Sequence, residues 1–281
     1  QLQKAPEAQF LINKVKKENI TKITLEGSGN TKVSLKKVES NWMLPNLNNF
    51  PANNQAVDQL LTRLVEIKKG LQVSKQKTSF ERLKVSKNNF ERKVSLFDGD
   101  SLIDEIYFGS APSLRQAHAR KGSEDLVFAI KFAANDIDML TSDWIKKDIL
   151  VIPEKEIKSI LTPEVFLERI ENKVSEKEEN SSEELSTDQT RFEWFAKKIQ
   201  KNKVVNQNNA KELVKQIADM RINSIASEKD INKIDPRQKK IKIEVTLFDD
   251  NSFTYELAKI RDEEDFLLFN SQRDEIFRLP P

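Results

Sequence analysis

Hydrophobic residues recur along this chain with two spacings, at every second residue in some segments and at helical spacing in others. The first spacing predicts many short strands, and the second predicts a few helices. Apolar and polar residues alternate over residues 20–26, which is typical of a half-buried strand. The GSGN sequence at 27–30 predicts a hairpin turn after that strand, because glycine tolerates a positive φ. Similar alternation predicts further strands over residues 31–38, 41–44, 90–97, 101–108, 116–120 and 125–130.

Helical spacing replaces the alternation at two places in the first half. Asn53 or Asn54 can cap a first helix, which Gly70 closes. A second helix is predicted over residues 135–150, and Pro153 limits its extension. The apolar positions of the first helix are Val57, Leu60, Leu61, Leu64, Val65 and Ile67.

The same order of elements returns about 150 residues later. The tripeptide LFD at 96–98 recurs at 247–249, an offset of 151 (247 − 96). The helix pattern that begins at Asn53 recurs from Asn208, with its apolar positions offset by 153 (213 − 60). The second copy is therefore predicted as strands 156–161, 165–170 and 191–196, a helix 210–220, and strands 241–248, 253–259, 265–270 and 275–279.

Unequal offsets predict an insertion in the second copy. Ile23 matches Ile160 at an offset of 137 (160 − 23), whereas Trp42 matches Trp194 at 152 (194 − 42). The second copy has thus gained 15 residues (152 − 137) between its second and third strands, in the segment 171–190. That segment is rich in Glu and Ser and poor in apolar residues, which predicts a flexible insertion at a hairpin tip. A charged helix is the alternative.

Blocks of antiparallel strands with few helices predict an α+β fold. We expect an internal duplication, with two similar lobes of mainly antiparallel strands, one principal helix in each lobe, and a connecting helix between them. The expected parts are a juxtamembrane-like segment 1–19, lobe 1 at 20–134, the connecting helix at 135–153, and lobe 2 at 154–281 with its flexible acidic insertion 171–190.

The composition excludes or disfavours several kinds of site but does not indicate an activity. Residues 1–150 carry 24 Lys and Arg against 18 Asp and Glu, and the remainder carries 23 (47 − 24) against 27 (45 − 18). The net charges of the two halves are therefore +6 and −4, which are opposite in sign but small. Nucleic-acid binding is not expected from so small an imbalance. The chain has no cysteine, which excludes disulfides and thiolate metal sites, and a single histidine disfavours histidine-based metal sites. No apolar run is long enough to span a membrane.

His118 is the first candidate for chemistry. A serine, a histidine and an aspartate could form a catalytic triad, but no nucleophile-elbow sequence accompanies His118. It lies on an alternating predicted strand, so a histidine facing solvent is the favoured interpretation.

The acidic turns are the second candidate. Asp98-Gly99-Asp100, with Asp249-Asp250-Asn251 in the second copy, suggests a calcium loop, but calcium requires a longer series of oxygen ligands. A hairpin turn favours Asp-Gly at this place, so we expect turns.

Trp42 and Trp194 occupy matching places in the two copies. They could form a stacking platform for sugars or bases. Their apolar neighbours favour the alternative, in which each tryptophan anchors a core.

Five basic residues could bind anions. Acidic residues lie near them in the sequence, so a solvated face of mixed charge is the favoured interpretation. These residues are Arg115, Arg120, Lys121, Arg261 and Arg273.

Several motifs together resemble a known bacterial family. They are the ITKITLEG start at 20–27, the tryptophan strand NWMLP at 41–45, the PANN helix opening at 51–54, the FERLKV turn at 80–85, the VSLFDGD hairpin at 94–100, the IYFGS strand at 106–110 and the HARKGSEDLVFAI pair at 118–130. The chain resembles the family catalogued as domain of unknown function 4340. The resemblance covers residues 20–150 well and the second copy more loosely, where Ile260 replaces the glycine that follows the IYF strand.

The resemblance implies a location and a setting. In that family the domain follows a single N-terminal transmembrane helix, faces outside the cytoplasm, and often accompanies ABC-type transport components, including those of gliding motility. A chain that begins at Gln1 rather than Met fits an anchor removed from its N-terminus. The family has no assigned catalytic residues, so we predict no catalytic, cofactor-binding or metal-binding residue and no cofactor.

Three functions remain as hypotheses. The first is a non-enzymatic, membrane-anchored extracytoplasmic accessory whose partners are proteins, namely membrane transport components. The second is a module that binds cell-envelope glycan or another ligand, with Trp42 or Trp194 exposed. The third is an unrecognised hydrolase built on His118.

Overall fold

The computed structural model describes residues 9–12, 15–172, 191–198 and 206–281. The chain divides into two compact units, Gln1–Lys146 and Lys147–Pro281. Each unit contains one sheet of antiparallel strands with few helices, which fits the expected α+β class. Among the described helices, none combines the length and apolar character that a membrane span needs.

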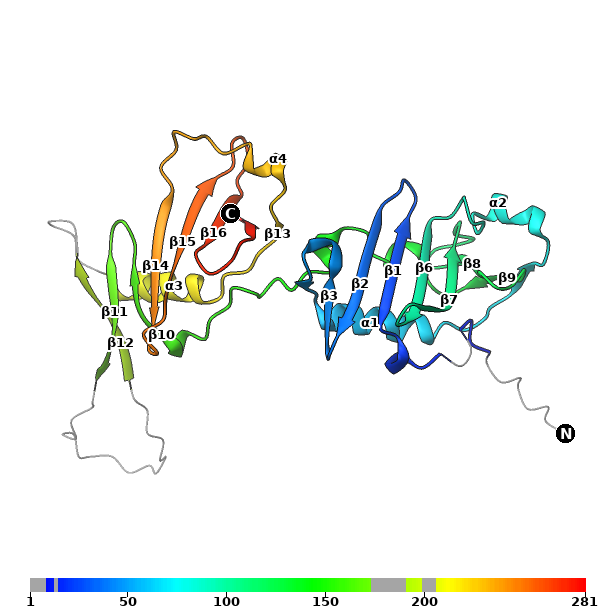
Figure 1. Cartoon of the computed structure of the whole chain (residues 1–281), viewed down its shortest axis with the longest axis horizontal. Coiled ribbons are helices and arrows are strands. Elements are labelled where there is room, and N and C mark those ends of the chain that lie inside the picture. The colour runs from blue at the N-terminus through cyan, green and yellow to red at the C-terminus, as the bar shows by residue number, and fades with distance from the viewer. Residues whose placement is uncertain (1–8, 13–14, 173–190, 199–205) are drawn as a thin grey trace, which may run out of the picture. The chain divides into compact units, whose positions relative to one another are not determined.

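The first unit is built on a nine-stranded sheet in the order β4-β3-β2-β1-β6-β7-β8-β9-β5 (Figure 1). Every neighbouring pair in it is antiparallel. Its strands are β1 (Lys22–Gly27), β2 (Lys32–Val38), β3 (Asn41–Leu44), β4 (Phe50–Pro51), β5 (Gln72–Ser74), β6 (Arg92–Asp98), β7 (Ser101–Phe108), β8 (Ala117–Lys121) and β9 (Val127–Ile130).

The two faces of this sheet are covered by different elements. Helix α1 (Asn54–Val65) runs across the strands (Figure 1), and Asn53 caps it by accepting a hydrogen bond from the Ala56 amide at 3.2 Å. Alternation places Ile106 on one face and Tyr107 on the other. Tyr107 packs in a cluster with Phe80, Leu83, Val85 and Val127, so the short helix α2 (Phe80–Leu83) and the segment after it cover the second face at β7 to β9.

The second unit has an eight-stranded sheet in the order β12-β11-β10-β14-β15-β16-β17-β13. Asn206 caps its main helix α3 (Gln207–Ala218), and Ser227 caps the short helix α4 (Glu228–Ile231). The strands are β10 (Ile157–Leu161), β11 (Phe166–Asn172), β12 (Arg191–Lys198), β13 (Ser224–Ile225), β14 (Ile241–Leu247), β15 (Ser252–Lys259), β16 (Phe266–Asn270) and β17 (Ile276–Leu279). Short 3-10 helices are η1 (Lys17–Asn19), η2 (Pro45–Leu47), η3 (Lys77–Ser79), η4 (Ala134–Asp136), η5 (Thr141–Asp143) and η6 (Glu154–Glu156).

Strand pairing corrects the offset of the LFD repeat. Ile23 pairs with Leu96, and Ile160, its match in the sequence, pairs with Val245. Leu96 thus lies at the level of Val245, an offset of 149 (245 − 96), and not at the level of Leu247. The turns explain the shift: Asp98 pairs with Ser101 across a two-residue turn, whereas a wider loop joins β14 to β15.

The insertion is also larger than the sequence suggests. Ile23 pairs with Leu35, and Ile160 pairs with Leu167, so the second strands are offset by 132 (167 − 35). The third strands keep the tryptophan offset of 152, so the connection between β11 and β12 is longer by 20 residues (152 − 132), not 15. In compensation, the connection between β10 and β11 is shorter than the one between β1 and β2 by five residues (137 − 132). A flexible insertion was predicted for residues 171–190. The first two of these residues end β11, and the others, 173–190, lie outside the described residues.

The connecting helix predicted at 135–150 is wrong. The segment contains η4 and η5 but no α-helix. Its backbone pairs with the chain before α1 instead: the Asn53 amide donates to the Trp144 carbonyl at 2.7 Å, and the Lys146 amide donates to the Pro51 carbonyl at 2.9 Å. Ile137, Trp144 and Ile145 are buried, so hydrophobic packing favours this extended route. The unit boundary falls after Lys146, inside the predicted helix.

Candidate functional site

A surface cavity of about 810 Å³ lies in the first unit, where α1 ends. Its wall comes from the end of α1 and the segment that follows, from the start of β5, from the loop before β8, and from β9. Small-molecule sites commonly have volumes of about 300–1,000 Å³, so this hollow has the size of a ligand site.

Gly70 brings two parts of this wall together. A Cβ atom at Gly70 would lie 1.9 Å from the Ala129 carbonyl oxygen, which any side chain would force apart. The Ala129 amide donates to the Leu71 carbonyl at 2.8 Å, and this bond fixes the chain before β5 against β9. Only glycine permits so close an approach.

Positive charge predominates in the lining. Arg63, Lys68, Lys69 and Lys131 line the cavity with one acidic residue, Glu66. Arg63 pairs with Asp136 outside the lining, and the Lys69 ammonium lies 3.8 Å from a Glu124 carboxylate oxygen. For Lys68 and Lys131, the described residues provide no ion-pair partner.

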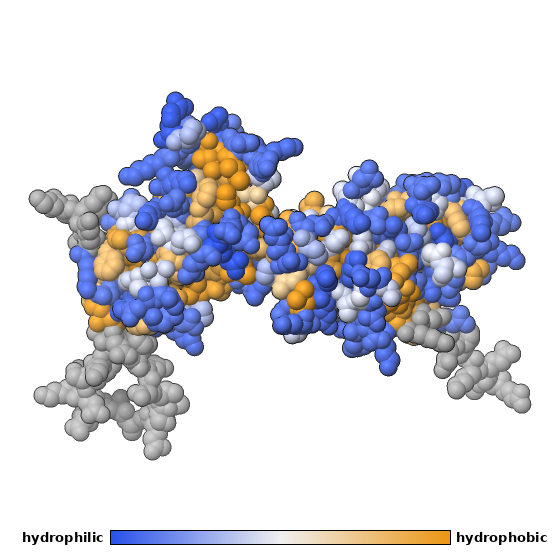
Figure 2. Space-filling model, viewed as in Figure 1, coloured by the Kyte–Doolittle hydropathy of each residue, from blue (hydrophilic) through white to orange (hydrophobic). Residues whose placement is uncertain are grey.

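Apolar side chains form the rest of the wall. Ile67, Ile130 and Phe132 are buried, and the Arg63 guanidinium lies 4.8 Å from the centre of the Phe132 ring. Leu71, in contrast, is 78% exposed. Figure 2 shows that hydrophilic residues cover most of the visible surface and that smaller hydrophobic areas interrupt them.

His118 also borders this cavity, and the expectation that it faces solvent is wrong. It is only 9% exposed, because β8 lies between β7 and β9 in the part of the sheet that is covered on both faces. Its Nδ1 lies 3.1 Å from the Ser110 hydroxyl. Burial lowers the pKa of His118, so the imidazole is neutral near pH 7. Among the described residues no carboxylate bonds to it, as a triad would require.

A solvated position was predicted for five basic residues, and Arg120 differs most from that prediction. It is 6% exposed, and its guanidinium donates to the carbonyls of Val85 at 2.8 Å, Lys121 at 3.0 Å and Glu124 at 3.1 Å. Its guanidinium carbon lies 4.7 Å from the centre of the Tyr107 ring. These contacts tie Nε and Nη1 to backbone carbonyls within the fold, so Arg120 holds the covering segment rather than an anion.

The other basic residues of that prediction do not form one site. Lys121 pairs with Asp104 at 3.0 Å in the first unit, while Arg273 pairs with Glu275 at 3.7 Å in the second. Arg115 lies in a loop of the first unit with a positive φ of 56°, and Arg261 belongs to the second unit.

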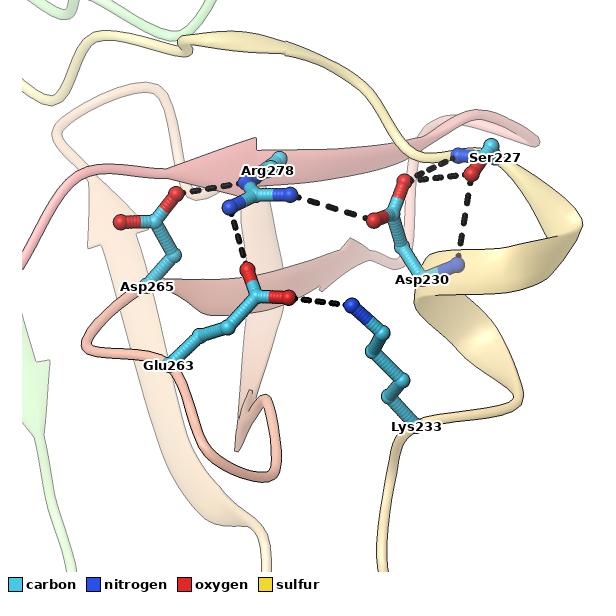
Figure 3. A network of polar contacts seen from close by, with 6 residues as sticks. All are labelled: Ser227, Asp230, Lys233, Glu263, Asp265 and Arg278. Atoms are coloured by element: carbon cyan, nitrogen blue, oxygen red, sulfur yellow. Dashed lines mark hydrogen bonds and ion pairs between the residues drawn. The ribbon is translucent and has the colours of Figure 1, made fainter.

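The sequence analysis missed a charged network in the second unit (Figure 3). Arg278, on β17, donates to Asp265 and Glu263, which lie in or near the turn before β16, and to Asp230 of α4 at 3.1 Å. Lys233 pairs with the same Glu263. The network fastens α4 to the sheet.

Ser227 and Asp230 complete the network as a capping box. The Ser227 amide donates to the Asp230 carboxylate at 2.8 Å, and the Asp230 amide donates back to the Ser227 hydroxyl at 3.3 Å; the hydroxyl also donates to Asp230 at 2.6 Å. The Ser227 hydrogen bond is the main cause that lowers the pKa of Asp230, and the charge of Arg278 adds to it. The Ser-x-x-Asp spacing at 227–230 is a known helix-start signal and was available in the sequence.

Both matching tryptophans lie in the core, as expected. Trp42 is 6% exposed and Trp194 is 2% exposed, so neither offers a stacking surface. The acidic turns are hairpin turns, with a left-handed backbone at Gly99 (φ 56°) and Asp250 (φ 64°). Within the part of the chain that the structure describes, no group of three or more His, Asp or Glu side chains is placed to hold a metal ion.

Comparison with known proteins gives one match. No curated protein and no solved structure is similar to this chain at a significant level. The family described as Domain of unknown function (DUF4340) matches residues 42–239, from β3 to the residues before β14. This match spans more than half of the chain, and the chain therefore belongs to the DUF4340 family.

Proposed function

We propose that this protein is a non-enzymatic extracytoplasmic accessory, a partner-binding component of an ABC-type transport system in the bacterial envelope. The family match over residues 42–239 carries the proposal, because the resemblance links such domains to transport components. The polar groups point the same way. Arg120 and Arg278 are occupied in holding covering segments, which is the work of a scaffold.

We also propose that the two units arose by internal duplication. Each strand of the second sheet has a counterpart at the same place in the first sheet, where only β4 has no match among the described residues of the second. Both main helices begin with an asparagine cap, and both third strands carry a buried tryptophan. Two copies of one unit would each fold alone. Expression of each unit separately should then give cooperative unfolding, and an unfolded product from either would contradict it.

The transport role is tested by capture from the native membrane. The full-length protein, with any N-terminal anchor in place, is crosslinked in its own cells, and its partners are identified by mass spectrometry. Transporter subunits in near-stoichiometric yield would support the accessory role. Recovery of the protein alone, or with glycan only, would overturn it.

A ligand-binding module is the second candidate, and the cavity beside α1 favours it. The buried tryptophans argue against a version in which they stack on sugar rings. A ligand would instead bind where Leu71 and the lysines line the cavity.

A further inference from the structure

The cavity at the end of α1 combines a cationic lining with apolar side chains that the fold leaves in water. Its volume of about 810 Å³ suits a small molecule.

The charge of the lining is not balanced by its neighbours. Four cations and Glu66 give a net charge of +3 (4 − 1) for the lining. Asp136 and Glu124 offset two of these cations, which leaves +1. Lys68 and Lys131 are both exposed, so their ammonium groups are available to an anion.

The neutral His118 at the wall does not add to this charge. Its hydrogen bond to Ser110 occupies Nδ1 within the fold. An anion would therefore be held by Lys68 and Lys131.

The apolar part of the lining lacks cover. Leu71 is 78% exposed and Val73 is 38% exposed, although both line the cavity. Val73 belongs to β5, an edge strand, and Leu71 immediately precedes it. Removing a side chain such as that of Leu71 from water is favourable. An apolar chain in the cavity would provide this cover.

We propose that this cavity binds an amphiphile with one anionic head and a single apolar chain. The head, a carboxylate or a phosphate, lies against Lys68 and Lys131, and the chain lies over Leu71 and Val73. A neutral amphiphile lacks the first contact, and a free anion lacks the second.

The test is calorimetric titration of the whole chain with octanoate and with octyl phosphate. Octyl glucoside is the neutral probe, and inorganic phosphate is the probe without a chain. We expect at least one octyl anion to bind more tightly than both of these, and the better one identifies the head group. Equal binding of octyl glucoside, equal binding of inorganic phosphate, or no binding of either octyl anion overturns the proposal.

Variants locate the site. Leu71→Asp should weaken binding by at least about tenfold, because it removes the apolar contact and adds a negative charge. Lys131→Glu should weaken it by about fivefold or more and reduce its salt dependence. Leu114→Asp and Lys32→Glu are matched controls, since Leu114 is 90% exposed, Lys32 is exposed and neither lines the cavity. Unchanged binding in both cavity variants, with thermal stability retained, refutes this location.

Discussion

Replacement of Arg120 by alanine tests whether this side chain holds the first unit together. The guanidinium makes three hydrogen bonds of 3.1 Å or shorter to backbone carbonyls, one of them from the covering segment at Val85. It also lies against the rings of Phe80 and Tyr107, at 4.4 Å and 4.7 Å from their centres. Alanine would remove the arginine donor from the Val85 and Glu124 carbonyls, leave the Lys121 carbonyl with its bond from the Glu124 amide, and open a space beneath α2.

The expected loss follows from these contacts. Each hydrogen bond contributes roughly 1–1.5 kcal/mol net, so three contribute about 3–4.5 kcal/mol. The ring contacts add about 0.5–2 kcal/mol, and water entering the space recovers part of the total. We therefore expect Arg120→Ala to lower the free energy of unfolding of the first unit by at least about 3 kcal/mol.

Urea denaturation followed by tryptophan fluorescence measures this loss. A Trp194→Phe background leaves Trp42 and Trp144 as reporters, and both belong to the first unit. Arg115→Ala, in an exposed loop of the same unit, is the control and should change stability by less than about 0.5 kcal/mol. A loss below about 1 kcal/mol for Arg120→Ala would refute the argument that these hydrogen bonds hold the segment.

Other predictions follow from single contacts. Arg278→Ala should destabilise the second unit by roughly 1–3 kcal/mol, and hydrogen exchange should then show α4 amides losing protection while the first unit is unchanged. Gly109→Ala should cost the first unit at least about 2 kcal/mol in a thermal melt, because its Cβ would lie 2.1 Å from the Leu83 carbonyl oxygen. All three tryptophans are buried, so iodide should quench native fluorescence only weakly and quench it strongly in urea; strong native quenching would revive a stacking platform.

Local patterns predicted most of the strands. In the meander of each unit, alternation and turn residues specify where a strand begins and ends, and the structure has strands there. The helix with Val57 and Leu64 on its buried side also follows from spacing alone. These features depend on neighbours within about ten residues, which the sequence displays directly.

The cover on the second face of the sheet could not be predicted in this way. His118 and Arg120 lie on a strand whose alternation fits either a solvated or a buried face. The residues that cover Arg120 come from 80–85, more than 25 residues earlier, and that segment forms only a short helix. The helix predicted at 135–150 failed for a related reason, because its backbone partners at 51–53 are distant in the sequence.

Short identities proved a weaker guide to equivalence than pairing. The LFD tripeptide is conspicuous, yet in the first unit it ends a strand at a two-residue turn, and in the second it enters a wider loop. The tryptophans gave the correct register, because each is fixed in a core by its partner strand: Trp42 opposite Lys37 and Trp194 opposite Arg169.

Each unit holds a covering segment with an arginine, and the two arginines are not at equivalent positions. Their bonding partners differ, and this difference predicts which unit loses stability first as the pH falls. Arg120 binds carbonyls, which do not titrate in this range, whereas Arg278 binds carboxylates. The folded-state pKa of Asp230 is lowered, so its stabilisation is present above the unfolded value of 3.8 and is lost as pH falls through the folded value. Burial raises the pKa of Asp104 in the first unit, so its protonation on acidification favours the folded state. Hydrogen exchange from about pH 4 downward should therefore show α4 and β17 losing protection before β6 to β8, and the reverse order would show that these arginine contacts do not govern acid stability.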